Sequence, residues 1–72
     1  MQRLHIGRLI RAKLEEKGQT VTWLARQVPC SRTNIYKIFD RPSIDTDMLA
    51  RLSDILEYDF FAALSDGLNR GK

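Results

Sequence analysis

The chain has 72 residues, of which 43% are hydrophobic and 29% are charged, and its formal net charge is +3. This composition is typical of one soluble globular domain, which at this length buries about 60% of the surface that the unfolded chain exposes. The core is therefore small and leaves no room for a deep catalytic cleft. No apolar run approaches the roughly 18 residues of a membrane span, and the first residues do not resemble a signal peptide. We expect a cytoplasmic protein without a membrane partner.

The sequence contains one cysteine, Cys30, and one histidine, His5. A single cysteine excludes an internal disulfide and fits a reducing compartment, and we expect Cys30 to be a buried small side chain rather than a reactive thiol. One cysteine and one histidine do not suffice for a zinc site within one chain. No set of residues typical of catalysis is present, so we expect no enzymatic activity, no cofactor and no metal.

The first element that the sequence predicts is an amphipathic helix over residues 4–17. Its apolar residues recur at helical spacing and form one stripe: Ile6, Leu9, Ile10 and Leu14. Gly18 follows this helix and can adopt the left-handed conformation that commonly ends one. His5 is expected at the surface or at the boundary of the core.

Residues 21–40 predict two short helices separated by a three-residue turn. Each helix carries one apolar stripe, formed by Val21, Leu24, Ala25 and Val28 in the first and by Ile35, Ile38 and Phe39 in the second. Pro29 interrupts the pattern because it has no N–H and disfavours helical geometry in the residue before it. Thr20 and Ser31 are the expected N-caps of the two helices.

The second of these helices has an outer side that differs from its apolar stripe. This side holds a guanidinium, a methyl-bearing hydroxyl, a phenol, an ammonium and a carboxylate, from Arg32, Thr33, Tyr36, Lys37 and Asp40. These groups suit base edges and phosphates in a DNA major groove. The alternative reading is the ordinary solvated face of a small helical protein.

Charge is distributed unevenly along the chain. Residues 1–41 contain nine Lys/Arg and three Asp/Glu, whereas residues 42–72 contain three Lys/Arg and six Asp/Glu. The net charge is therefore +6 in the first part and −3 in the second. A segregated positive field attracts polyanions, so it favours a nucleic-acid partner.

The rest of the chain predicts a loop at residues 40–44, two further helices and a polar tail. Asp45 is the expected cap of the fourth helix, whose apolar side is Met48, Leu49, Leu52, Ile55 and Leu56. Asp59 is the expected cap of a short fifth helix. Phe60 and Phe61 cannot face the same direction, so we expect one in the core and the other exposed at a subunit contact. Residues 1–64 then form the domain, and residues 65–72 a frayed tail.

The chain resembles the phage-repressor-like helix-turn-helix domains of the lambda repressor and Cro type. The resemblance covers residues 6–64 and rests on Ile6-Gly7, Ile10, Lys17-Gly18, Thr20, Leu24-Ala25, Ser31, Ile35, Ile38, Leu49, Leu52 and Leu56. The stretch from Cys30 to Leu49 is also similar to small single-domain bacterial regulators. The resemblance implies an all-α, compact five-helix domain in which the second and third helices form the helix-turn-helix.

The resemblance implies that the residues after Ser31 read bases and that Thr20 lies in a phosphate-contact region, and the residue pattern itself adds the other candidates. Base-reading candidates are Arg32, Thr33, Tyr36 and Lys37, and Lys37 is also a candidate phosphate contact. Phosphate candidates are Thr20, Thr22, Asn34, Arg41 and Ser43, and dimer candidates are Phe60, Phe61 and Leu64. Two positions depart from the family pattern, namely Val21 where a phosphate-binding Gln is common and Pro29 where the turn usually has Gly.

We therefore expect sequence-specific binding of double-stranded DNA by a homodimer that regulates transcription, and we expect no small-molecule effector within this domain. A protein-interaction module on the same fold is the alternative, for example an antitoxin-like or assembly partner that uses Trp23, Phe60 and Phe61 as anchors. RNA binding has less support, because the base-stacking sheet of many single-strand readers is absent from the expected fold.

Overall fold

The structure, a computed structural model, describes residues 5–70, and the side chains of residues 5–66. This part of the chain forms five α-helices and no strand: α1 (Ile6–Glu16), α2 (Val21–Gln27), α3 (Arg32–Asp40), α4 (Thr46–Leu56) and α5 (Phe60–Arg70). The all-α prediction is therefore confirmed. The expected start of α1 at residue 4 lies outside the described residues.

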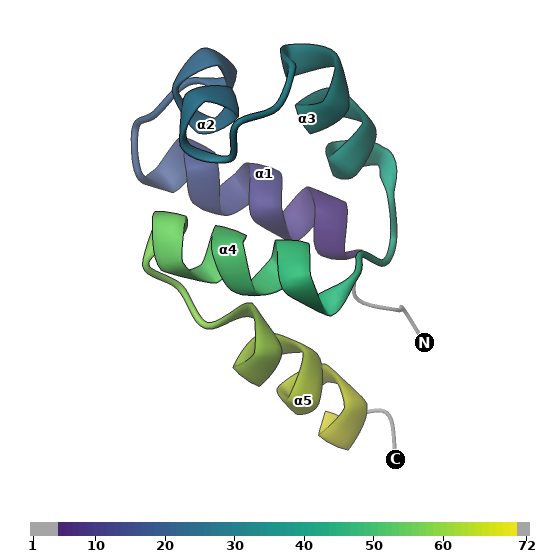
Figure 1. The fold of residues 1–72 in the computed structure, drawn as a ribbon. Helices are drawn as coiled ribbons and strands as arrows, with labels where there is room; N and C mark the ends of the chain where they lie inside the picture. Colours follow the sequence, from purple (N-terminus) through teal and green to yellow (C-terminus); the bar gives the residue numbers. More distant parts are fainter. Residues whose placement is uncertain (1–4, 71–72) are drawn as a thin grey trace.

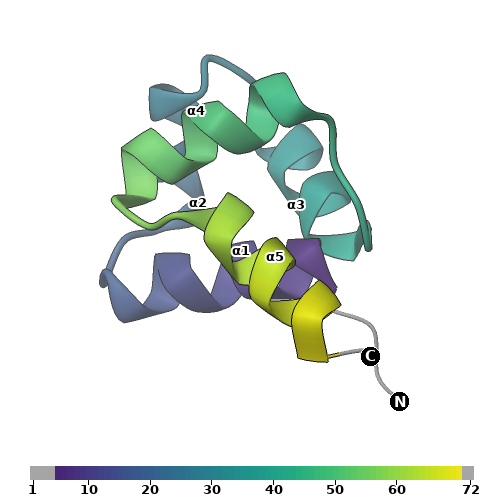
Figure 2. The same cartoon turned by 90° about the horizontal axis from the view of Figure 1, so that it is seen from below.

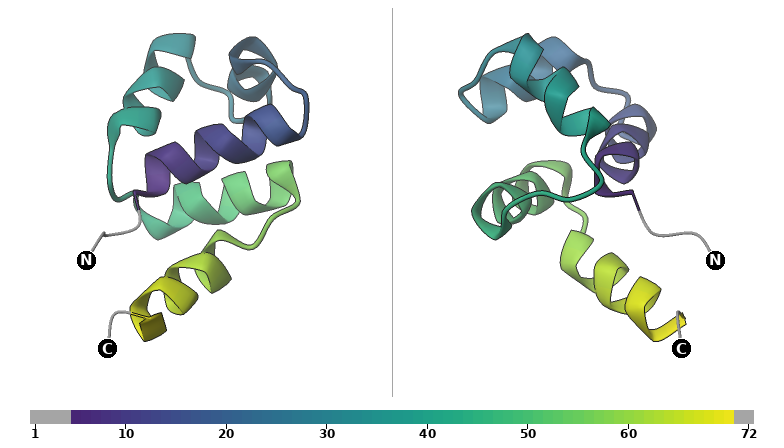
Figure 3. Two further views of the ribbon diagram at one scale, coloured as in Figure 1. Left: turned by 180° about the vertical axis from the view of Figure 1, so that it is seen from behind. Right: turned by 90° about the vertical axis from the view of Figure 1, so that its right-hand side faces the viewer.

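The helices stack in three levels along the longest axis of the molecule (Figure 1). The pair α2 and α3 lies above α1, and α4 runs beside α1 on the other side. Helix α5 lies below α1 and α4, at the end of the molecule opposite to α3 (Figures 2 and 3). The molecule measures 38 × 22 × 21 Å. This arrangement leaves one side of α3 uncovered by any other helix.

The core is formed by one buried cluster to which all five helices contribute. Its members are apolar: Ile6, Ile10, Leu14, Leu24, Ala25, Val28, Ile35, Phe39, Leu49, Leu52, Leu56 and Phe60. The predicted stripes supply this cluster, although Leu9, Val21, Ile38, Met48 and Ile55 are only half-buried at its border. Cys30 and Trp23 also pack against the cluster and are half-buried, so the expected full burial of the Cys30 thiol is corrected to partial burial.

Helix α1 is delimited by two local interactions. At its start, the Nδ1 atom of His5 accepts a hydrogen bond from the backbone N–H of Arg8 at 3.1 Å, so His5 acts as an N-cap that the sequence did not reveal. At its end, Gly18 has a φ of +74°, as predicted. The N–H of Gln19 then donates to the carbonyl of Leu14 at 3.3 Å, which satisfies one of the last free carbonyls of the helix.

The connection between α2 and α3 follows a path without positive φ. Among the described residues only Gly18 and Glu57 have a positive φ, so Pro29 does not need the left-handed conformation that it cannot adopt. The N–H of Cys30 instead reaches back to the carbonyl of Ala25 at 3.1 Å. Val28, which the sequence places in the helix, is the C-cap of α2 and remains buried.

Pro42 lies in the loop that joins the end of α3 at Asp40 to the start of α4 at Thr46. Arg41 is extended, with φ −87° and ψ 132°, as expected for a residue before proline. The backbone N–H groups of Ile6 and Gly7 donate to the carbonyls of Pro42 and Arg41 at 3.2 and 2.9 Å, which fixes this loop to the start of α1.

Asp45 occupies the N-cap position of α4, but its side chain accepts no cap hydrogen bond. The prediction that Asp45 caps α4 is therefore correct in position and wrong in mechanism. Its carboxylate lies instead at the rim of a groove described below.

Helix α4 ends at Glu57, which adopts a left-handed conformation with a φ of 54°. The Nζ of Lys17, at the end of α1, donates to Oε1 of Glu57 at 2.6 Å. This hydrogen bond and the charge of Lys17 lower the pKa of the Glu57 carboxyl. The ion pair joins the C-terminal ends of α1 and α4, which lie side by side (Figure 1).

Helix α5 begins with the predicted cap, since Oδ1 of Asp59 accepts a hydrogen bond from the N–H of Ala62 at 3.0 Å. The helix continues to Arg70, so it extends into the segment 65–72 that the sequence predicts to be a polar tail. Gly67 does not end the helix, because one glycine costs a helix only about 1 kcal/mol relative to alanine. Residues 71–72 lie outside the described part.

The described part of the chain contains neither a membrane-spanning helix nor a cluster of metal-ligating side chains. No helix within residues 5–70 has the length and hydropathy required to cross a bilayer. The same part of the chain contains no group of three or more His, Cys, Asp or Glu residues that could hold a metal ion.

Candidate nucleic-acid interface

The outer face of α3, defined as Arg32, Thr33, Tyr36, Lys37 and Asp40, is exposed at every position. The opposite side of the helix is anchored by Ile35 and Phe39, which are 0% and 6% exposed. Because these two residues fix the rotation of the helix, they also determine where the outer face points. The direction predicted from the apolar stripe is therefore the one observed.

The start of α3 is fixed by its cap. Oγ of Ser31 accepts a hydrogen bond from the backbone N–H of Asn34 at 3.2 Å, as the sequence predicts. The cap holds the first turn of α3, which carries Arg32 and Thr33, in a defined position.

The outer face has a ridge and two flanks. Thr33, Lys37 and Asp40 stand at i, i+4 and i+7 and form the ridge, since these positions align on one side of a helix. Arg32 and Tyr36 form the first flank. Tyr36 is 55% exposed, and its ring meets the buried ring of Phe39 edge-on at 6.1 Å between centroids. The ring of Tyr36 thus packs against the core, while more than half of the residue's surface remains exposed.

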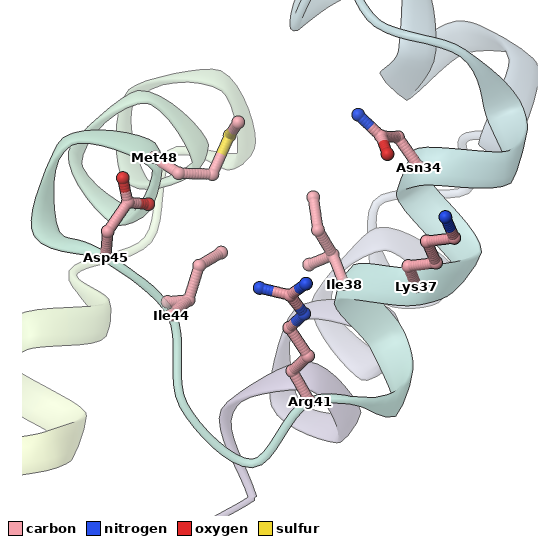
Figure 4. A pocket seen from close by; sticks show the side chains of 7 residues that line it. All are labelled: Asn34, Lys37, Ile38, Arg41, Ile44, Asp45 and Met48. Atoms are coloured by element: carbon pink, nitrogen blue, oxygen red, sulfur yellow. The ribbon is translucent and has the colours of Figure 1, made fainter.

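The second flank, formed by Asn34 and Arg41, borders a groove between α3 and the beginning of α4, with a volume of about 270 Å³ (Figure 4). It is lined by polar side chains from the α3 side, by apolar side chains and by one carboxylate: Asn34, Lys37, Arg41, Ile38, Ile44, Met48 and Asp45. The side chain of Arg41 extends into the space between Ile38 and Ile44 (Figure 4). The groove therefore combines hydrogen-bond donors and two positive charges with an apolar wall and the one carboxylate of Asp45.

The cations of this region lack acidic partners. The ion pairs among the described side chains are Arg11–Glu15, Lys13–Glu16 and Lys17–Glu57, and none of them involves Arg32, Lys37 or Arg41. These three charges remain available for an external anion. The cations of α1 near its C-terminal end, by contrast, are already paired.

The remaining predicted site residues lie at the edges of this surface. Thr20, Thr22 and Ser43 are exposed, but Ser43 does not line the groove. Oγ1 of Thr20 accepts a hydrogen bond from the N–H of Trp23 at 3.0 Å, which confirms the predicted cap. This bond also occupies the Trp23 N–H, so that donor is not free for a phosphate.

Five residues of this surface were not singled out as site residues from the sequence: Ile38, Ile44, Asp45, Met48 and Arg11. Ile44 and Met48 line the groove. From the sequence alone, Ile44 is expected only in the loop after α3, and Met48 only in the core-facing stripe of α4. Arg11 of α1 lies over the Phe39 ring, with its Cζ atom 6.0 Å from the ring centre. A pattern within one helix does not indicate such a contact, because it joins residues from two different helices.

The dimer candidates are separated by the structure. Phe60 is 0% exposed and makes an edge-on contact with Tyr58, so it belongs to the core. The expectation that Phe60 contacts a second subunit is therefore wrong. Phe61 is 40% exposed, and Leu64 is half-buried one turn later on α5. Only Phe61 and Leu64 remain accessible to a partner.

No protein-family model, curated protein or solved structure matches this chain. The function is therefore inferred from the residues and their arrangement.

Proposed function

We propose that this protein binds double-stranded DNA by inserting α3 into the major groove, and that it regulates transcription, most simply as a repressor. The observation that carries this proposal is the unpaired cationic surface of Arg32, Lys37 and Arg41 on and directly after one capped, exposed helix. A major groove is about 12 Å wide and admits one α-helix. Phosphates border such a helix on both sides, where the cations of α3 lie.

The arrangement of α2 and α3 supports a helix-turn-helix of the phage-repressor type. The two short helices are joined by residues 28–31 and lie together above α1 (Figure 1). In this motif the second helix reads bases while its partner crosses the DNA backbone. Helix α3 is the one with the exposed polar ridge, so it takes the reading role.

The contacts follow from side-chain chemistry. Arg32 presents two parallel donors that fit O6 and N7 of a guanine, and the methyl group of Thr33 fits the methyl group of a thymine. Tyr36 reads bases from the same flank as Arg32. Lys37, on the ridge and at the groove, contacts a base edge or a phosphate. Only contacts to bases contribute directly to sequence specificity.

The groove at the second flank is the proposed seat of the DNA backbone. Asn34 and Arg41 donate to phosphate oxygens, while Ile44 and Met48 provide an apolar wall for the adjacent sugar. Ser43 extends this contact along the loop, and Thr20 and Thr22 provide a second phosphate contact at the start of α2. A homodimer formed through Phe61 and Leu64 would place two copies of α3 on half-sites about one helical turn apart.

The structure gives less support to the protein-interaction alternative than to DNA binding. Of its three anchors, Phe60 is buried and Trp23 is half-buried, so only Phe61 is openly exposed. A protein-binding module would also have no need for three unpaired cations around α3.

The proposal is tested by selecting binding sites from a random duplex library at two salt concentrations. Enrichment of an inverted repeat, with an affinity that falls steeply with salt, is the expected result. A steep salt dependence without an enriched motif would reduce the function to nonspecific DNA binding. No binding near 0.1 M salt would overturn the proposal in favour of a protein partner.

A further inference from the structure

The start of α1 is attached rigidly to the end of α3. Gly7 packs against the backbone carbonyls of Ile38 and Phe39, and a Cβ atom added to Gly7 would clash with both carbonyl oxygens. The N–H of Gly7 also donates to the carbonyl of Arg41 at 2.9 Å. A side chain on the exposed side of α1 therefore keeps a fixed position relative to the outer face of α3.

Arg11 is such a side chain, one turn after Gly7. Its guanidinium carbon lies 6.0 Å from the centre of the Phe39 ring, and Tyr36 contacts the same ring edge-on. The side chain of Arg11 is nevertheless 62% exposed. Arg11 thus adds a cation from another helix beside the first flank of α3.

Tyr36 and Asn34 stand two positions apart on α3, so they point to opposite flanks of the helix. Arg41 lies at the flank of Asn34, where both residues line the groove, and Arg11 lies at the flank of Tyr36. The outer face is consequently bordered by one arginine on each side. An arginine on each side of α3 suits a helix that lies in a DNA groove, because phosphates line both walls of such a groove.

We propose that Arg11 contacts a DNA phosphate on the wall of the major groove opposite to the one contacted by Arg41. This inference rests on the proposed DNA-binding function and extends the interface from α3 to α1. The Phe39 ring orients the guanidinium, since a cation over an aromatic face is attracted by the ring. Glu15 limits the contact in the free protein, because its carboxylate lies 3.6 Å from Nε of Arg11 and competes with the phosphate.

The test is the salt dependence of duplex binding, measured by fluorescence anisotropy for the full chain with a random-sequence duplex of about 20 base pairs. Arg11→Ala is expected to weaken binding on every sequence and to lower the slope of log K against log salt by about 0.9. Arg11→Lys should restore most of this slope, because it keeps the charge. Glu15→Gln should tighten binding at low salt more in the wild-type background than in Arg11→Ala, because only part of the effect comes from removing one negative charge.

Arg51→Ala is the matched control, since Arg51 is exposed on α4 and should leave the slope unchanged. If wild-type protein binds DNA and Arg11→Ala retains the full slope, the inference is overturned and the proposed function stands. If wild-type protein does not bind duplex DNA at all, both are overturned. A circular dichroism melt of each variant shows that loss of binding is not loss of folding.

Discussion

Gly7 of α1 lies against the backbone carbonyl of Phe39 in α3, so closely that no side chain fits between the two helices. This contact sets the distance between α1 and α3, and therefore the position of the outer face of α3.

Replacing Gly7 by alanine should destabilise the protein, since the neighbouring atoms are backbone and cannot rotate away. We expect Gly7→Ala to lower the free energy of unfolding by about 1–3 kcal/mol, the range for overpacked cores, and to weaken DNA binding through displacement of α3. Urea denaturation measures the first effect. Ala12→Gly, at an exposed position of the same helix, should cost about 0.5–1 kcal/mol and spare DNA binding. An unchanged urea midpoint for Gly7→Ala would contradict the observed packing.

Ser31 and Asp45, which occupy the N-cap positions of α3 and α4, should differ in their contribution to stability. Ser31→Ala removes the hydrogen bond to the N–H of Asn34 and should cost about 1 kcal/mol. Asp45→Ala should cost less, because the Asp45 side chain makes no cap hydrogen bond. Thermal denaturation of both variants under the same conditions provides the comparison, and an equal loss in the two would show that Asp45 caps α4 in solution.

Arg32 and Lys37 should affect DNA binding in different ways. Arg32→Ala should cost about 1–3 kcal/mol on the preferred site and relax specificity at one position, whereas Lys37→Ala should weaken all sequences and reduce the salt slope by about one. Titrations of both variants against the selected site and against random duplex separate these effects. Equal losses on both DNAs for both variants would contradict this division of roles.

The ion pair between Lys17 and Glu57 should make stability depend on pH. The pKa of Glu57 is lowered in the folded state, so the pair stabilises the fold above the carboxyl's unfolded pKa of about 4.3. This contribution is lost as the pH falls through the lowered pKa. Glu57→Gln should therefore differ most from wild type near pH 7 and least near pH 3, in urea denaturation.

Phe61 should matter for assembly and little for folding. Phe61→Ser should shift sedimentation towards the monomer and weaken binding to an inverted repeat, because its side chain is 40% exposed. Phe60→Ala should instead cost about 3–5 kcal/mol of folding stability, since Phe60 is in the core. An unaltered sedimentation profile for Phe61→Ser would exclude this part of α5 from the dimer contact.

The features that the sequence predicts correctly are local. Gly18, Thr20, Ser31 and Asp59 act through backbone groups within a few residues, and the apolar stripe of α3 fixes the direction of its outer face. Local rules also have limits, as Asp45 shows, because an N-cap residue can turn its side chain elsewhere.

The features that the sequence does not predict join distant segments. Lys17 and Glu57 are 40 residues apart, and the contact of Gly7 with Ile38 and Phe39 depends on how two helices cross. The same holds for Arg11 beside the Phe39 ring. Such contacts follow from packing, which a pattern along one helix does not encode.

Binding of DNA by the outer face of α3 can be mapped residue by residue by NMR. Isotope-labelled protein would be titrated with a duplex containing the selected site, and changes in backbone amide shifts would be mapped onto the structure. We predict changes concentrated at residues 20–22 and 32–45, with a smaller set around Arg11 and few in α4 after its first turn. Changes confined to α5, or no changes at a salt concentration near 0.1 M, would show that the outer face of α3 does not bind DNA.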